Sequence, residues 1–141
     1  EKLAASLGLE NMTWTEFRQK DELADSLSAC HAALISQREG VEGVAVPCKL
    51  YGILASGRSV IAAVPKTSEV ASVLREEGCG IVVSPGDAEG LAREIAALAD
   101  DPARALQMGF RARNAYLLNY TIERAVERFE TICCQPNADA R

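Results

Sequence analysis

The residues best suited to chemistry lie in a glycine-rich stretch, Glu39-Gly-Val-Glu-Gly-Val-Ala-Val-Pro47, which Cys48 and Lys49 follow directly. Pro47 suits the first turn of a helix, where its missing N–H costs nothing, so we predict a helix over residues 49–55 with Lys49 in its first turn. Backbone N–H groups at a helix N-terminus, next to a lysine, can bind a phosphate or a pyrophosphate. Glycine spacing alone is a weak signal, and a plain surface loop with a solvated Lys49 is the alternative interpretation.

Other chemical groups near this stretch give weaker signals. Glu39 and Glu42 can accept hydrogen bonds from sugar hydroxyls, although Glu42 is also explained as a solvated loop charge. His31 is the single histidine, and we expect it to be a partly buried structural residue rather than a general base. A nucleophilic Cys48 needs a histidine partner, so we do not expect nucleophilic catalysis. The stretch matches neither the GxGxxG dinucleotide fingerprint nor the GxxxxGK[ST] phosphate loop.

Strand-length apolar runs alternate with segments of helical spacing along the chain. We predict strands at residues 12–17, 32–35, 60–64 and 81–83, and helices at residues 1–7, from 21, and at 49–55, 67–77, 88–99, 103–114 and 121–132. Thr67 is the predicted cap of its helix, and Trp14 and Phe17 are expected to pack in or beside the sheet. The fold class is therefore α/β, a Rossmann-like parallel sheet with helices on both faces and C-terminal helices, over residues 1–134. We expect a disordered tail at 135–141.

In such open parallel sheets the ligand lies beyond the carboxyl ends of the strands. The connections that qualify are residues 18–20, 36–47, 65–67 and 84–87. The second is the longest and contains the glycine-rich stretch, so it is the strongest candidate for a binding site.

Composition excludes several classes of protein. The chain has 141 residues, 48% of them apolar, and 15 Lys and Arg against 20 Asp and Glu give a net charge of −5. This balance argues against a nucleic-acid partner and against broad, unspecific attraction to anionic membranes, while leaving room for a local basic site. Five cysteines without CxxC spacing indicate thiols in a reducing compartment and no metal site. With no apolar run of about 20 residues, we expect a cytoplasmic protein.

Several segments together resemble the C-terminal donor-binding domain of GT-B glycosyltransferases of group 1, or family 4, over nearly the whole chain. They are Ser36-Gln-Arg-Glu39-Gly40, Val46-Pro-Cys-Lys49-Leu-Tyr51-Gly52, Gly57-Arg58-Ser-Val-Ile-Ala62, Gly78-Cys-Gly80, Pro85-Gly-Asp87 and Asp101-Pro-Ala-Arg-Ala-Leu-Gln-Met108-Gly109. The resemblance implies transfer of a sugar from a nucleotide-sugar, UDP- or GDP-linked, to an acceptor without a metal or another cofactor. Catalysis would then come from donor positioning and electrostatic stabilisation of the leaving diphosphate.

The same resemblance implies which residues bind the donor. The residues expected at the diphosphate and sugar are Glu39, Gly40, Val44, Ala45, Val46 and Lys49, and those expected at the nucleoside are Phe17, Arg18 and Gly52. The family's glutamate pair is not intact: Glu39 matches the first member, whereas Gly52 stands where the second would contact the ribose. The Lys-x-Tyr-Gly form at this place resembles a branch of the family used in surface polysaccharide assembly.

The family domain's opening strands, and the acceptor domain that usually supplies the catalytic base, would precede Glu1. We therefore expect part of a two-domain enzyme that transfers no sugar alone, and no catalytic residue is assigned within it. Expected partners are the nucleotide-sugar, the missing N-terminal acceptor domain, a membrane surface reached through the full-length enzyme, and a second copy of the chain at the open sheet edge. The alternative is a non-catalytic nucleotide- or phosphate-binding module. A flavodoxin-like receiver or interaction domain is less favoured, because the sequence lacks the acidic cluster after a first strand that phosphoryl acceptance requires.

Overall fold

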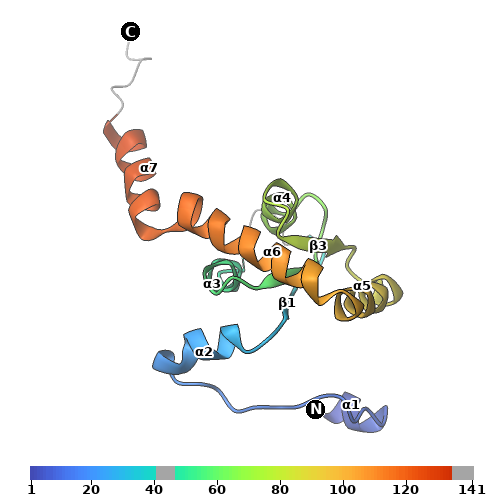
Figure 1. The fold of residues 1–141 in the computed structure, drawn as a ribbon. Helices are drawn as coiled ribbons and strands as arrows, with labels where there is room; N and C mark the ends of the chain where they lie inside the picture. Colours follow the sequence, from blue (N-terminus) through green and yellow to red (C-terminus); the bar gives the residue numbers. More distant parts are fainter. Residues whose placement is uncertain (41–46, 135–141) are drawn as a thin grey trace.

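A computed structural model describes residues 1–40 and 47–134 of the chain (Figure 1). In chain order its elements are α1 (Lys2–Ser6), the 3-10 turn η1 (Lys20–Glu22), α2 (Leu23–Ser28), β1 (Ala32–Ser36), α3 (Lys49–Ala55), β2 (Ser59–Ala63), α4 (Glu69–Glu76), β3 (Gly80–Val83), α5 (Ala88–Asp100), α6 (Pro102–Ala115), the π-helical turn η2 (Tyr116–Tyr120) and α7 (Ile122–Cys134). The predicted tail at 135–141 lies outside the described residues.

The three described strands form a parallel sheet in the order β1-β2-β3. Its register pairs Ala33 of β1 with Val60 of β2, and Val60 with Gly80 of β3. A helix follows each strand, so the carboxyl ends of all three strands, and the starts of α3, α4 and α5, lie at one end of the sheet. This arrangement confirms the predicted parallel α/β fold.

Alternate residues of the central strand β2 pack into two apolar layers. Val60 lies in one buried cluster with Leu54 of α3 and Leu74 of α4. Ile61 lies in a second cluster with Leu98 of α5. Because neighbouring side chains of a strand point to opposite faces, the helices cover both faces of the sheet, as predicted.

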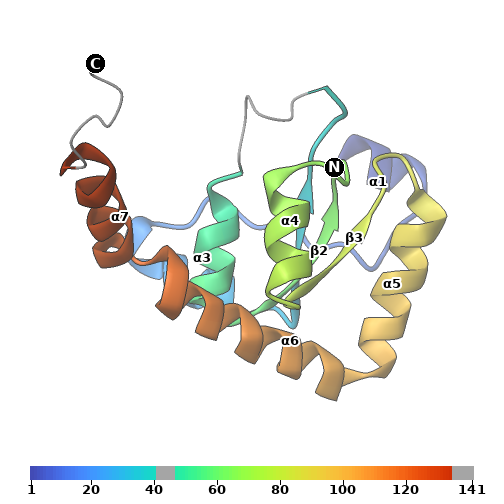
Figure 2. The same cartoon turned by 90° about the horizontal axis from the view of Figure 1, so that it is seen from above.

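The long helix α6 joins the two layers. Figure 2 shows it running from the end of α5 past the ends of α4 and α3. Its Ala105 belongs to the cluster of Ile61, and its Ala112 belongs to the cluster of Val60. Where α6 passes the turn after α3, a Cβ added to Gly109 would collide with the carbonyl oxygen of Gly57, so this crossing requires glycine.

The predicted strand at residues 12–17 is wrong, because this segment is irregular. Trp14 and Phe17 do not pack against the sheet: they are 54% and 99% exposed. An isolated segment of β-like composition cannot satisfy its backbone groups without an adjacent strand. In the described part of the chain, the sheet pairs only β1, β2 and β3.

Two smaller expectations are also wrong. Ser68, rather than Thr67, is the N-cap of α4, and its hydroxyl accepts a hydrogen bond from the backbone N–H of Ala71 at 3.2 Å. His31 is exposed rather than partly buried, although its carbonyl oxygen accepts a 3.0 Å hydrogen bond from the Ser59 hydroxyl. Ser68, one residue after Thr67, has the extended backbone that an N-cap requires.

Candidate functional site

Three helices begin at the carboxyl end of the sheet, so their backbone N–H groups and positive dipole ends face the same region. Two of these starts are capped from within the chain. Ser68 caps α4, and the Asp87 carboxylate accepts a 2.8 Å hydrogen bond from the Gly90 N–H at the start of α5. At α3, the described residues make no side-chain cap hydrogen bond.

Both cations and carboxylates lie at this end of the sheet: Glu39 follows β1, Glu69 begins α4 and Asp87 caps α5. The cations come from three segments. Lys49 is the first residue of α3, Arg38 lies in the connection after β1, and Lys66 lies in the connection before α4. All three are exposed. Cations beside a helix N-terminus favour a multiply charged anion such as a diphosphate.

Three of the residues predicted at the diphosphate and sugar are described and exposed: Glu39 and Gly40 lie in the connection after β1, and Lys49 is the first residue of α3. Gly40 has a φ of +81°, a left-handed conformation that favours glycine. The other three, Val44, Ala45 and Val46, lie outside the described residues. The described members of the set thus lie after β1 or at the start of α3, both at the carboxyl end of the sheet.

The residues predicted at the nucleoside are not brought to this connection. Phe17 and Arg18 lie in the irregular segment before η1, and the Arg18 guanidinium is 3.9 Å from the Glu22 carboxylate. Two residues further on, Lys20 lines a groove with Arg58, which precedes β2 at the opposite end of the sheet.

Gly52 faces α2. A Cβ at Gly52 would lie 3.1 Å from Cδ1 of Leu27, so a larger residue would require the leucine to shift. The close approach of α2 to α3 therefore gives this glycine a packing role. That role is independent of the glutamate that the family carries at the matching place.

Tyr51 is a further candidate residue of the site that the sequence analysis did not predict. Its ring lies 5.4 Å from that of Tyr120 in η2. Burial raises the pKa of Tyr51, and electrostatic interactions with Glu69 and Cys48 raise it further. The phenol beside Tyr120 is therefore a neutral group that can donate a hydrogen bond. The only signal in the sequence is an aromatic residue in the first turn of the predicted helix.

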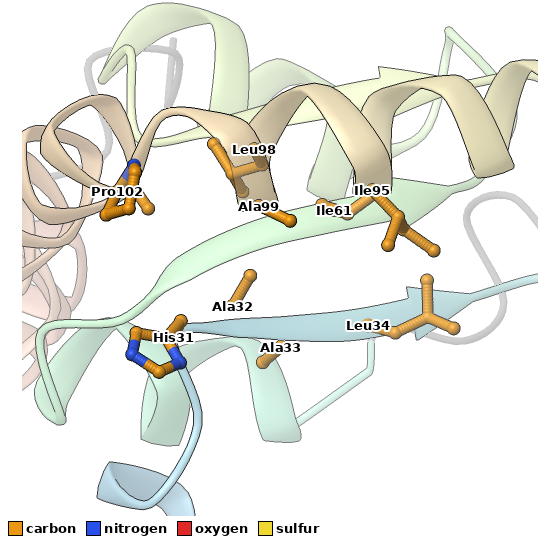
Figure 3. Close-up of a pocket in the computed structure, with 10 residues that line it drawn as sticks. His31, Ala32, Ala33, Leu34, Ile61, Ile95, Leu98, Ala99 and Pro102 are labelled. Carbon is orange, nitrogen blue, oxygen red and sulfur yellow. The ribbon is translucent and has the colours of Figure 1, made fainter. Parts of the chain in front are cut away.

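A cavity of about 550 Å³ lies away from this end of the sheet, between β1 and α5 (Figure 3). Its apolar walls come from Ala32, Leu34, Ile61, Ile95 and Leu98. Among the described residues that line it, His31 is the one with a titratable side chain. Half of the Leu34 side chain, 49%, remains exposed beside it. Such a cavity favours packing against apolar groups over acid–base chemistry.

Comparison with known proteins decides the family. The family model of the group 1 glycosyl transferases matches residues 1–101. The chain belongs to this family. It is 31% identical over 110 residues to a probable glycosyltransferase, WbjE, of Pseudomonas aeruginosa, covering 78% of this chain and 27% of that protein. The family resemblance seen in the sequence is confirmed.

A solved structure shows the same fold. The crystal structure of Anabaena HepE in complex with UDP-glucose matches 94% of this chain with a TM-score of 0.71 and 21% identity. The chain covers 35% of that protein, so it spans about a third or less of the length of both relatives. Among residues 1–40 and 47–134, no helix is long and apolar enough to cross a membrane.

Proposed function

We propose that this chain is the nucleotide-sugar-binding part of a glycosyltransferase that transfers the sugar of a UDP- or GDP-linked donor to an acceptor. The observation that carries the proposal is the start of α3 at the carboxyl end of the sheet, with Lys49 exposed in its first turn. Membership of the group 1 glycosyl transferases supports it. HepE, which has the same fold, was crystallised with UDP-glucose, which favours a UDP-linked donor.

The chemistry follows from where negative charge develops. As the bond from the sugar to the diphosphate breaks, charge builds on the leaving diphosphate oxygens. The N–H groups at the start of α3 and the Lys49 ammonium meet this charge, and the carboxylate of Glu39 accepts hydrogen bonds from sugar hydroxyls. We propose no resident metal, since these groups supply the positive charge.

The acceptor and the catalytic base belong to another part of the protein. We propose that this part joins the chain through the outer edge of β1, whose backbone pairs on one side only within the described sheet. Leu34 and Ile95, about half exposed beside the cavity of Figure 3, would then be covered. The chain alone therefore binds donor without transferring sugar, and copies of it are expected to associate through the same edge.

The acceptor class rests on the Lys-x-Tyr-Gly form at residues 49–52, which resembles enzymes of surface polysaccharide assembly. We accordingly propose a role in polysaccharide or glycoconjugate synthesis in the cytoplasm.

Calorimetric titration of the chain with UDP, GDP, ADP and their glucose esters tests donor binding. We expect one nucleotide to be preferred and Lys49→Ala to weaken its binding about tenfold, the loss expected for one charge-assisted hydrogen bond. The control is Arg93→Ala, which removes an exposed cation from α5. An equal effect of both variants, or no binding at all, would contradict the proposal.

The sugar separates the two candidate functions. A transferase should prefer one sugar donor among the nucleotide-sugars, whereas a non-catalytic module need not discriminate between them. Steady transfer to an acceptor by this chain alone would contradict the proposed division of roles.

A further inference from the structure

A groove of about 770 Å³ lies between α2, α3 and α6. Gly57 and Arg58, which immediately precede β2, form part of its wall. The groove therefore lies at the amino end of the strands, opposite the proposed donor site, and the donor does not account for it.

Three cations line this groove: Lys20, Arg58 and Arg113. Among the described residues that line it, none is acidic, although the whole chain has a net charge of −5. The positive charge is therefore concentrated locally against the overall balance.

Two of these cations are held in place. The Arg113 guanidinium donates a hydrogen bond to the carbonyl oxygen of Ala55 and lies 5.8 Å from the centre of the Tyr116 ring. Arg58 is half-buried, and its buried Nε has no hydrogen-bond partner among the described residues. A buried donor without a partner is costly, so the guanidinium of Arg58 has unmet hydrogen-bonding capacity beside the groove.

The rim of the groove is apolar and open to solvent. Leu23, Leu106 and Phe110 line it and are 51%, 57% and 64% exposed. Leu106 and Phe110 lie one turn apart on α6, so they share one face of that helix. Large apolar side chains beside fixed cations match the two parts of an anionic phospholipid.

We propose that this groove docks the protein on a membrane surface that contains anionic phospholipid. The lipid phosphate binds among Lys20, Arg58 and Arg113, and Leu106 and Phe110 enter the boundary of the acyl chains. A soluble anion would use the cations but would leave both apolar side chains in water. The inference is independent of the donor site and of the proposed transfer.

Sedimentation of the chain with vesicles tests the proposal. We expect binding to vesicles of phosphatidylcholine mixed with phosphatidylglycerol, little binding to phosphatidylcholine alone, and weaker binding as salt rises. Absence of binding to the mixed vesicles would overturn the proposal.

Two double variants locate the surface. Lys20→Gln with Arg58→Gln should lower vesicle binding about 25-fold, since each cation near an anionic surface contributes about fivefold. Leu106→Gln with Phe110→Gln should lower it at unchanged net charge. The matched control, Arg93→Gln with Arg104→Gln, removes two exposed cations outside the groove and should change binding much less.

Thermal melting of each variant shows that it is folded; if Arg58→Gln unfolds the chain, Lys20→Gln and the apolar pair carry the test. Equal losses in the groove and control variants would overturn the proposal in favour of general charge attraction. Saturable binding of glycerol phosphate with no binding to vesicles would overturn it in favour of a soluble anion. Binding of the chain to an acidic protein, without binding to vesicles, would overturn the proposal in favour of a protein partner.

Discussion

Alkaline pH should destabilise the protein through Cys79, whose thiol is completely buried at the start of β3. Burial, with a contribution from Glu77, raises the pKa of this thiol from 9.0 to about 11. Above pH 9 the unfolded chain loses the thiol proton while the folded chain keeps it, so the free energy of unfolding falls as pH rises from 9 to the folded pKa and levels off above it. The two pKa values give a loss of about 1.4 kcal/mol at about pH 10.

The assay is urea denaturation under reducing conditions at about pH 8 and about pH 10. Cys79→Ala should lower the free energy of unfolding at both pH values, because it leaves a small void, but its further fall between them should be smaller by about 1.4 kcal/mol. For Cys133→Ala, at an exposed position in α7, the free energy of unfolding should fall between the two pH values as much as it does for the wild type. Equal falls in wild type and Cys79→Ala would refute the buried, protonated thiol, because lysines and tyrosines titrate alike in both.

Substitutions at three further positions test the packing and one helix cap by urea denaturation. Gly109→Ala should destabilise the protein by about 1–3 kcal/mol, because its Cβ would collide with the Gly57 carbonyl; a stabilised variant would show that α6 can shift at no cost. Asp87→Ala should cost about 1 kcal/mol by removing the cap on the Gly90 N–H, while Asp87→Asn should retain most of it. Leu54→Ala should cost about 2–5 kcal/mol because Leu54 is fully buried, and a smaller loss would contradict its place in the core.

The parallel sheet could be predicted because its strands are short apolar runs with clear ends. The structure places β2 at Ser59–Ala63 and β3 at Gly80–Val83, within one residue of the predicted segments. Pro47 and Gly57 flank α3, as predicted. Pro47 lies before the N-cap Cys48 rather than in the first turn, whereas Gly57 has the left-handed φ of +66° that follows a helix. In these elements local preference and tertiary packing favour the same structure.

Residues 12–17 could not be predicted in the same way. Their composition favours a strand, but strand formation depends on a neighbouring backbone, which a local pattern cannot reveal. Placing Phe17 and Arg18 at the nucleoside depended on that strand and stays a prediction. Its basis in the fold is weaker now that both residues lie in an irregular segment.

The two proposed binding regions differ in how far the sequence could indicate them. The start of α3 was predictable because Pro47 and Lys49 are close in sequence. The groove was not, because Lys20, Arg58 and Arg113 come from three distant segments that only the packed helices bring together. Tyr51 was missed for the same reason, since its partner Tyr120 lies near the far end of the chain.

The path of α6 has a consequence for how the domain opens. Because Ala105 lies in one apolar layer and Ala112 in the other, neither layer can separate from the sheet without disturbing this helix. The two layers should therefore unfold as one cooperative unit, with backbone amides on both faces exchanging their hydrogens through the same global opening. The family match ends at residue 101, one residue before α6 begins, so this coupling comes from a helix beyond the matched segment.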